Sequence, residues 1–226
     1  MPTALESKAA LELLTADAVA TVNSYAARVQ GSAEVRRAAT LEAVPEIVGY
    51  YSLGAAALAA DFYEDARESA GAAGRFTATA VVADRTVRVR RGVAWATEPW
   101  FEDLDQTVDE RFALIVGGEV PRGYRDTILT NRRADSEAIG WQRIASPIAC
   151  KFCRFLAANG AVYKESTVRF AAHGDCSCTA APVFKGGATG PEASVEQYTA
   201  SRRARTDRDR ARLREWLNAA YPDVRG

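Results

Sequence analysis

The stretch of residues 45–69 reads PEIVGYYSLGAAALAADFYEDARES, and it decides how the first part of the chain folds. Its larger apolar residues recur every three to four positions, which places them on one face of a helix. Small residues at positions 54–60 give this helix a smooth surface on which another helix can pack closely. The apolar face is formed by Val48, Tyr51, Ala55, Leu58 and Phe62.

Two more helices are expected before this one. Apolar residues at positions 5–29 follow the same spacing, and Gln30-Gly31-Ser32 ends the pattern. Ser32 can cap a second helix that begins near Ala33. We expect Pro45 to break or kink that helix and to start the third, because proline lacks an N–H group and clashes with the preceding turn. Three helices within 70 residues predict a helical hairpin or bundle.

The chain changes character after the glycine-containing linker at residues 71–74. Valines and threonines dominate residues 76–93, and arginines alternate with them at positions 88 and 90. This pattern indicates extended chain, with a hairpin turning at Ala83-Asp84-Arg85. Two short strands need partners, so we expect this piece to lean on the bundle or on another subunit.

Helical spacing returns after residue 93. A helix should begin near Pro99, where acidic residues gather, and Gly117-Gly118 should end it. Residues 121–133 are expected to form another helix. The fold class is therefore α+β and mainly helical. We expect a helical region over residues 1–74, an extended segment with helices over 75–136, a small domain clamped by cysteine and histidine over 137–185, and a linker with a basic helix over 186–226.

Composition and charge narrow the class of protein. Charged residues make up 26% of the 226 residues and apolar residues 48%, which is ordinary for a globular chain and argues against disorder. Residues 1–110 carry 17 acidic and 10 basic side chains, whereas residues 111–226 carry 12 and 19. The second half is thus the one that could face a polyanion. No secretory signal is evident, and the apolar run at residues 53–60 is too short to span a bilayer, so we expect a soluble protein with no membrane partner.

All four cysteines and the single histidine lie within residues 150–178. A Cys-x-x-Cys pair is followed, after 19 residues, by His-x-x-Cys-x-Cys. This spacing is typical of metal ligands, and thiolate and imidazole donors suit zinc. We predict a structural Zn²⁺ site that stabilises a region with few large aliphatic residues. Its expected ligands are Cys150, Cys153, Cys176 and Cys178, with His173 as an alternative ligand or as a hydrogen-bond partner of a thiolate.

Other states of this cluster remain open. The four thiols could stay reduced and pack as small buried residues, or one or two disulfides could form. A redox Cys-x-x-Cys normally begins a helix after a strand in a βαβ unit, and the sequence shows no such unit. A Cys–His hydrolase would use His173 as its base, but three further thiols would crowd that pair. We therefore expect no enzymatic activity.

A second candidate site is the arginine-rich segment near the C-terminus. Residues 195–221 predict one helix, and between positions 202 and 214 only Asp207 and Asp209 oppose the arginines. The simplest interpretation is a solvated helix face. The functional interpretation is contact with DNA phosphates or an acidic protein surface, without base recognition. The arginines concerned are Arg202, Arg203, Arg205, Arg208, Arg210 and Arg212.

The chain from about residue 43 to residue 184 resembles the Mu F-like minor head proteins of tailed bacteriophages. The cysteine–histidine pattern is the most specific part of the resemblance. The actinobacteriophage branch of that family also carries a helical segment similar to residues 51–65. The other similar segments are Asp126-Thr127-Ile128, Gly140-Trp141-Gln142-Arg143, residues 150–163 and residues 173–184.

This resemblance implies a minor capsid protein that acts in head morphogenesis. The implied partners are the portal protein, the major capsid protein and nonspecific double-stranded DNA, with several copies per virion. The implied location is the capsid interior or portal region, and the host cytoplasm during assembly. A different class of function is a zinc-dependent nucleic-acid-binding or nuclease-like module. Hydrolytic zinc needs an open coordination position, which four thiolates would fill.

Overall fold

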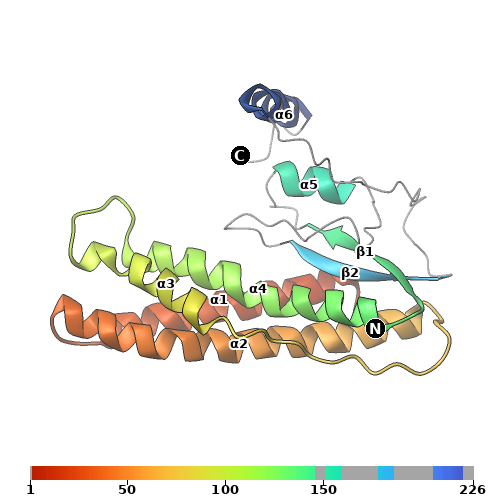
Figure 1. Cartoon of the computed structure of the whole chain (residues 1–226), viewed down its shortest axis with the longest axis horizontal. Coiled ribbons are helices and arrows are strands. Elements are labelled where there is room, and N and C mark those ends of the chain that lie inside the picture. The colour runs from red at the N-terminus through yellow and green to blue at the C-terminus, as the bar shows by residue number, and fades with distance from the viewer. Residues whose placement is uncertain (1, 146–150, 159–177, 186–205, 221–226) are drawn as a thin grey trace.

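The computed structural model describes residues 2–145, 151–158, 178–185 and 206–220. Long helices form most of this part of the chain, and one two-stranded sheet accompanies them (Figure 1). The predicted class, α+β and mainly helical, is confirmed. The elements in chain order are α1 (Ala4–Arg28), α2 (Ala33–Ser69), α3 (Thr86–Ala96), the 3₁₀ turn η1 (Glu98–Trp100), α4 (Val108–Ala134), β1 (Ala138–Ile144), α5 (Lys151–Ala158), β2 (Thr179–Phe184) and α6 (Asp207–Ala220).

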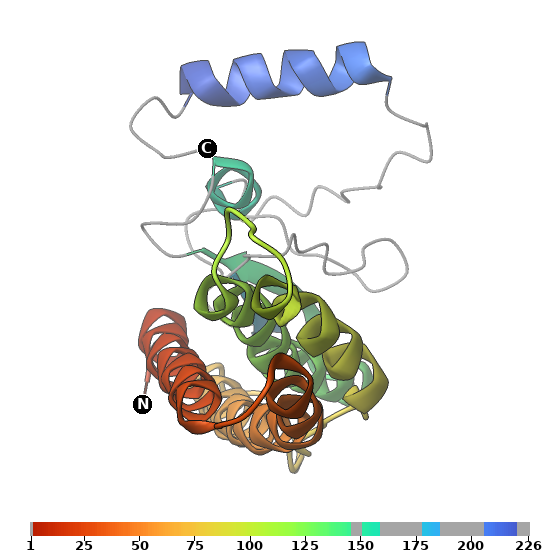
Figure 2. The same cartoon turned by 90° about the vertical axis from the view of Figure 1, so that its left-hand side faces the viewer.

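Helix α2 is the central helix of the bundle. Helices α1, α3 and α4 all pack against it, and α4 makes the most extensive contact (Figure 2). Its alanines Ala55, Ala56 and Ala59 have no exposed surface, which confirms the predicted smooth helix face. At Gly123 of α4, a Cβ atom would overlap the carbonyl oxygen of Ser52. The backbones of α2 and α4 therefore approach at a distance that only glycine permits.

Length and composition alone would allow α2 to cross a membrane, and it is the one such helix in the described part of the chain. In this structure, three other helices cover it on several sides. Val44 and Tyr63, near opposite ends of α2, are fully buried. These are the surroundings of a core helix in a bundle, where an apolar sequence packs against protein.

Two prolines that the sequence suggests as helix boundaries lie inside helices instead. Pro45 is buried within α2, which is unbroken, so the first 69 residues form two helices and not three. Helix α4 likewise continues through Gly117-Gly118 and Pro121. A proline in a helix interior costs about 3 kcal/mol, because it removes a hydrogen bond and clashes with the preceding turn. The adjacent residues Val44 and Val120 are fully buried, and we attribute the continuity of both helices to this packing.

Side-chain caps set the helix starts. Ser32 accepts a hydrogen bond from the backbone N–H of Val35, as predicted for the cap of α2. Thr107 and Glu110 form a capping box at the start of α4, and the backbone N–H of Thr107 holds the pKa of the Glu110 carboxyl below its usual value. The predicted start at Pro99 is wrong, since Pro99 lies in η1. The first N–H groups of a helix have no partner within the helix. The capping box at Thr107 supplies side-chain partners for them, whereas Pro99 supplies none, and this favours the later start.

The predicted hairpin over residues 76–93 is also wrong. Residues 75–85 have no regular structure, and the following residues form α3. The backbone of Thr79 exchanges two 2.8 Å hydrogen bonds with the Asn131 side chain, and the N–H of Val81 donates to Thr127 Oγ1 at 2.9 Å. Side chains of α4 thus replace a partner strand. Val89 and Val93 are buried four residues apart, which is helical spacing.

The sheet consists of β1 and β2, which pair antiparallel and pack on α4. Trp141 of β1 is 1% exposed and pairs with Pro182, while Ile144 pairs with Thr179. All six residues of β2 are buried. The sequence prediction placed no strand here, yet this pairing positions the chain that carries the cysteines.

Candidate functional site

Cys178 lies directly before β2, so the pairing of the two strands fixes its place. Its side chain is fully buried. Its backbone carbonyl accepts a 2.9 Å hydrogen bond from Nε of Arg125, which is buried on α4. The bundle therefore anchors Cys178, the last cysteine of the motif.

Cys153 lies on α5 and is 2% exposed. Helix α5 contacts β1, and β1 pairs with β2. The two described cysteines are thus both buried, and β1 lies between the elements that position them. This arrangement suits thiolate ligands of a metal, because burial excludes water from the donors.

The predicted metal centre extends beyond the described residues. Cys150, His173 and Cys176 lie outside them, so the four-ligand set stays a prediction. Among the residues that the structure does describe, no three His, Cys, Asp or Glu side chains form a metal-binding group. Helix α5 follows strand β1, but β2 returns antiparallel. This differs from the parallel βαβ unit in which redox Cys-x-x-Cys motifs occur.

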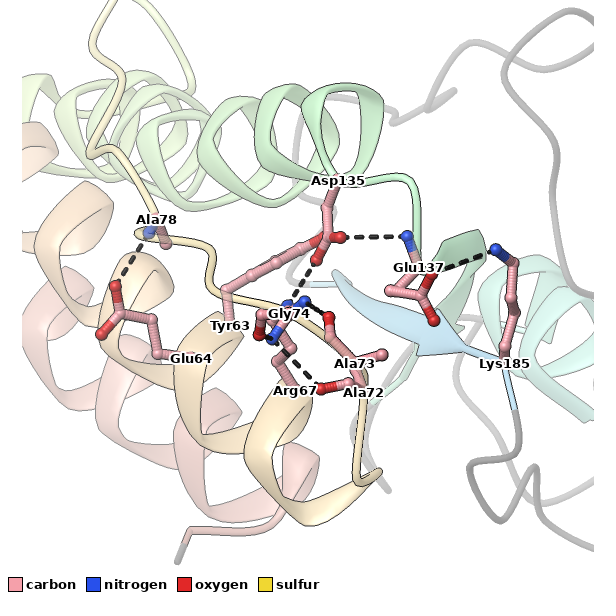
Figure 3. Close-up of polar contacts among 10 residues, drawn as sticks. All are labelled: Tyr63, Glu64, Arg67, Ala72, Ala73, Gly74, Ala78, Asp135, Glu137 and Lys185. Atoms are coloured by element: carbon pink, nitrogen blue, oxygen red, sulfur yellow. Dashed lines mark hydrogen bonds and ion pairs between the residues drawn. The ribbon is translucent and has the colours of Figure 1, made fainter.

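A buried ion pair joins the last turn of α2 to Asp135, the residue that caps the end of α4 (Figure 3). Nε of Arg67 donates to Oδ2 of Asp135 at 2.9 Å, and its other nitrogens donate to the carbonyls of residues 72, 73 and 74. Asp135 also accepts from the Tyr63 hydroxyl at 3.4 Å and from the N–H of Glu137 at 3.0 Å. Burial, together with the charge of Asp135, raises the pKa of the Tyr63 hydroxyl.

The same network continues to the residues that flank the sheet, where the Lys185 side chain bonds the Glu137 carboxylate (Figure 3). Its ammonium lies 3.2 Å from the Glu137 carboxylate, and its backbone N–H donates to the Glu137 carbonyl at 3.0 Å. Sequence reasoning missed these residues. Arg67 and Asp135 stand 68 positions apart, so no spacing rule connects them.

The predicted basic helix is confirmed over Asp207–Ala220 as α6. Arg208 and Arg212 are exposed on it, and the backbone of Arg210 belongs to the same helix. Arg202, Arg203 and Arg205 lie outside the described residues. Helix α6 is held by α5, where Trp216 meets the Phe155 ring edge-on at 5.0 Å and Asn218 accepts from Lys151 at 2.7 Å.

Comparison with known proteins gives one family. The family model described as VG15 protein, a viral (phage) protein family, matches residues 3–201, which include the bundle, the sheet and every cysteine. No curated protein and no solved structure matches the chain.

Proposed function

Because the chain belongs to the VG15 protein family, a family of phage proteins, we propose that it is a structural minor capsid protein of a tailed bacteriophage. In this proposal it acts in head morphogenesis, at the portal or the inner capsid surface. Its partners are the portal protein, the major capsid protein or both, and it is present in several copies per virion. The proposed role is structural, with no catalytic step.

The observation that carries this proposal is the contrast between a packed body and an exposed appendage. The bundle closes around α2, whose alanines Ala55, Ala56 and Ala59 are fully buried. Helix α6 lies beyond α5 and the sheet, away from the bundle in both views (Figures 1 and 2). All of its described side chains are exposed. A rigid body with an exposed helix suits a protein that links larger components.

A structural Zn²⁺ is part of the proposal. Cys153 and Cys178 fit such a site, because both are buried. Cys153 lies on α5, which contacts β1, and Cys178 directly precedes β2, which pairs with β1. Together with Cys150 and Cys176, or with His173 in place of one thiolate, they would complete a tetrahedral shell. The metal would hold α5 against the sheet and thereby position α6.

The test is to look for the chain in purified phage heads. We expect it in proheads or mature heads at a constant ratio to the portal protein, and we expect the purified chain to bind portal or capsid protein. Absence from both kinds of head would overturn the proposal. Metal analysis and a nuclease assay on the purified chain separate the alternative, because metal-dependent cleavage would favour a nuclease-like module.

A further inference from the structure

A buried arginine lies against Cys178. Arg125 of α4 is 4% exposed, and its Nε donates to the carbonyl of Cys178 at 2.9 Å. An arginine side chain keeps its charge at any physiological pH. A buried charge is costly unless opposite charge lies close to it. The position of Arg125 therefore favours negative charge at this buried cysteine.

The register of the sheet brings a second buried arginine to the same place. Arg143 of β1, also 4% exposed, pairs with Ala180, and Cys178 lies two residues before Ala180. Side chains of a strand alternate between its two faces, so Arg143 and Cys178 are diagonal neighbours on one face where the chain is extended. Such neighbours are about 7–8 Å apart, which is within reach of a long side chain.

The elements that hold the described cysteines carry positive charge only. Strand β1, helix α5 and strand β2 together contain Arg143, Lys151 and Arg154, and they contain no acidic residue. Glu137 directly precedes β1, and its carboxylate pairs with Lys185 at 3.2 Å. A neutral thiol or a disulfide supplies no negative charge to these cations, whereas a metal-bound cysteine is a thiolate. The charges around the cysteines therefore favour the metal-bound state.

We propose that Arg125 and Arg143 neutralise a zinc centre in which all four cysteines are thiolate ligands. Zn²⁺ with four thiolates carries two net negative charges, which two guanidinium groups balance. With His173 in place of one thiolate the centre carries one negative charge, which balances only one of them. The inference rests on the zinc site of the proposed function, and it adds the ligand set and two residues that stabilise it.

The test measures the zinc affinity of the full chain by competition with a chelator. Arg125→Gln and Arg143→Gln each remove a charge and keep a hydrogen-bond donor. We expect each to weaken zinc binding about 10–100-fold, as the loss of a group that supports metal ligands typically does. Arg125→Lys and Arg143→Lys keep the charge and should recover most of this affinity. Wild-type affinity in either glutamine variant would overturn the inference, and so would equal losses in the glutamine and lysine variants.

Arg122→Gln is the matched control, since Arg122 also lies on α4 but pairs with Glu119 at 3.3 Å. It should leave zinc affinity unchanged, and circular dichroism should show native helix content in all variants. Arg143 lies on β1, so its variants test the inference even where loss of Arg125 disturbs α4.

His173→Ala tests the ligand set. This variant should keep its zinc, and cobalt(II) bound in place of zinc should show the same thiolate-to-metal absorption as in the wild type. Lost metal or weaker absorption would overturn the assignment of four thiolates. A wild-type chain that binds no zinc contradicts the zinc site of the proposed function itself. Failure of the present inference alone differs from that result, because the wild type then binds zinc and the arginine variants bind it equally well.

Discussion

In the bundle, four helices bury their apolar faces against one another, whereas α5 and α6 meet the rest of the chain through a few side chains. Val22, Val44, Phe112 and Ile128, from three helices, have no exposed surface. Helix α6 is exposed at every described side chain. The comparison teaches that the bundle is stabilised by the burial of its own apolar faces, whereas α5 buries little of its surface against other elements, and for its attachment we propose a metal.

The two regions also treat charge differently. The bundle pairs its buried charged groups: Arg67 pairs with Asp135, and the buried Glu119 lies 2.5 Å from the exposed Arg88 and 3.3 Å from the partly exposed Arg122. On α6, Arg208, Arg212 and Arg214 are exposed to water. Charge in the bundle therefore serves stability, and charge on α6 is available for binding.

The largest effect is expected from Asp135→Ala. It leaves the buried Arg67 guanidinium without its carboxylate, and breaking a buried pair in this way costs about 3–5 kcal/mol. Asp126→Ala is the control, because the Arg85–Asp126 pair at 2.7 Å is partly exposed and should contribute about 1 kcal/mol or less. Urea unfolding followed by circular dichroism measures both. Equal losses would contradict the structural role assigned to the buried pair.

The next largest effect should come from Gly123→Ala. The new methyl group would overlap the Ser52 carbonyl and push α4 from α2, at a cost of about 1–3 kcal/mol. Gly117→Ala on the same helix meets open space, and it should stabilise the chain by up to about 1 kcal/mol because alanine favours helix. The free energies of unfolding of the two variants should thus change in opposite directions. A stable Gly123→Ala protein would show that the two helices can separate.

Alkaline pH should weaken the bundle. Burial raises the pKa of both Tyr63 and Tyr124, while tyrosines of the unfolded chain lose their protons near pH 10. Above that pH the unfolded state binds fewer protons than the folded state, so stability falls as pH rises. At pH 11 the loss should be roughly 1 kcal/mol for each tyrosine. Urea unfolding at pH 9 and 11 tests this, and the double variant Tyr63→Phe, Tyr124→Phe should show a smaller difference.

Metal removal should affect the cysteine-bearing end and leave the bundle nearly unchanged. We expect one Zn²⁺ per chain, lost in Cys153→Ser or Cys178→Ser. Hydrogen exchange should then become faster most strongly in α5, which carries Cys153, and least in α2, which packs mainly against α1, α3 and α4. A chain without stoichiometric metal would contradict the zinc proposal.

The smallest effect on stability is expected from replacing Arg202, Arg203, Arg205 and Arg208 with glutamine. The substitutions should weaken nonspecific DNA binding, because fewer phosphates are neutralised. The slope of log K against log salt should become shallower by about 0.9 for each phosphate that the variant no longer binds. Retention on a DNA column as a function of salt measures this, with the helical melting curve as the control for folding. Equal retention of both proteins at low salt would contradict a role for these arginines in DNA binding.

Local patterns in the sequence predicted the mainly helical class, the cap of α2 and the basic helix. Ser32 lies where α2 begins, and the arginine-rich segment is helical at α6. The errors at Pro45 and Pro121 have a shared cause. The free-energy cost of a proline inside a helix depends on its own turn alone. Burial of the neighbouring apolar residues against other helices can outweigh this cost. The alternating valines of α3 misled in the same way, since what they pack against lies on α2 and α4.

The candidate site, too, could be predicted only where its residues lie close together in the sequence. The cysteine–histidine spacing is visible in the sequence, because ligands of one metal often lie a few residues apart. The residues that carry this site on the bundle are not visible there. Arg125 donates a hydrogen bond to the carbonyl of Cys178, 53 positions away in the sequence. Arg67 donates a hydrogen bond to the carboxylate of Asp135, 68 positions away.

The sequence therefore determined that the chain is mainly helical, where charge lies in the chain, and which residues could bind a metal. Periodicity, capping and spacing act over a few residues, so they can be recognised without a fold. Only the tertiary structure decided that α2 is continuous, that residues 75–85 bond α4, and that Arg125 lies against Cys178. These outcomes depend on contacts between distant residues, whose energies local patterns do not contain.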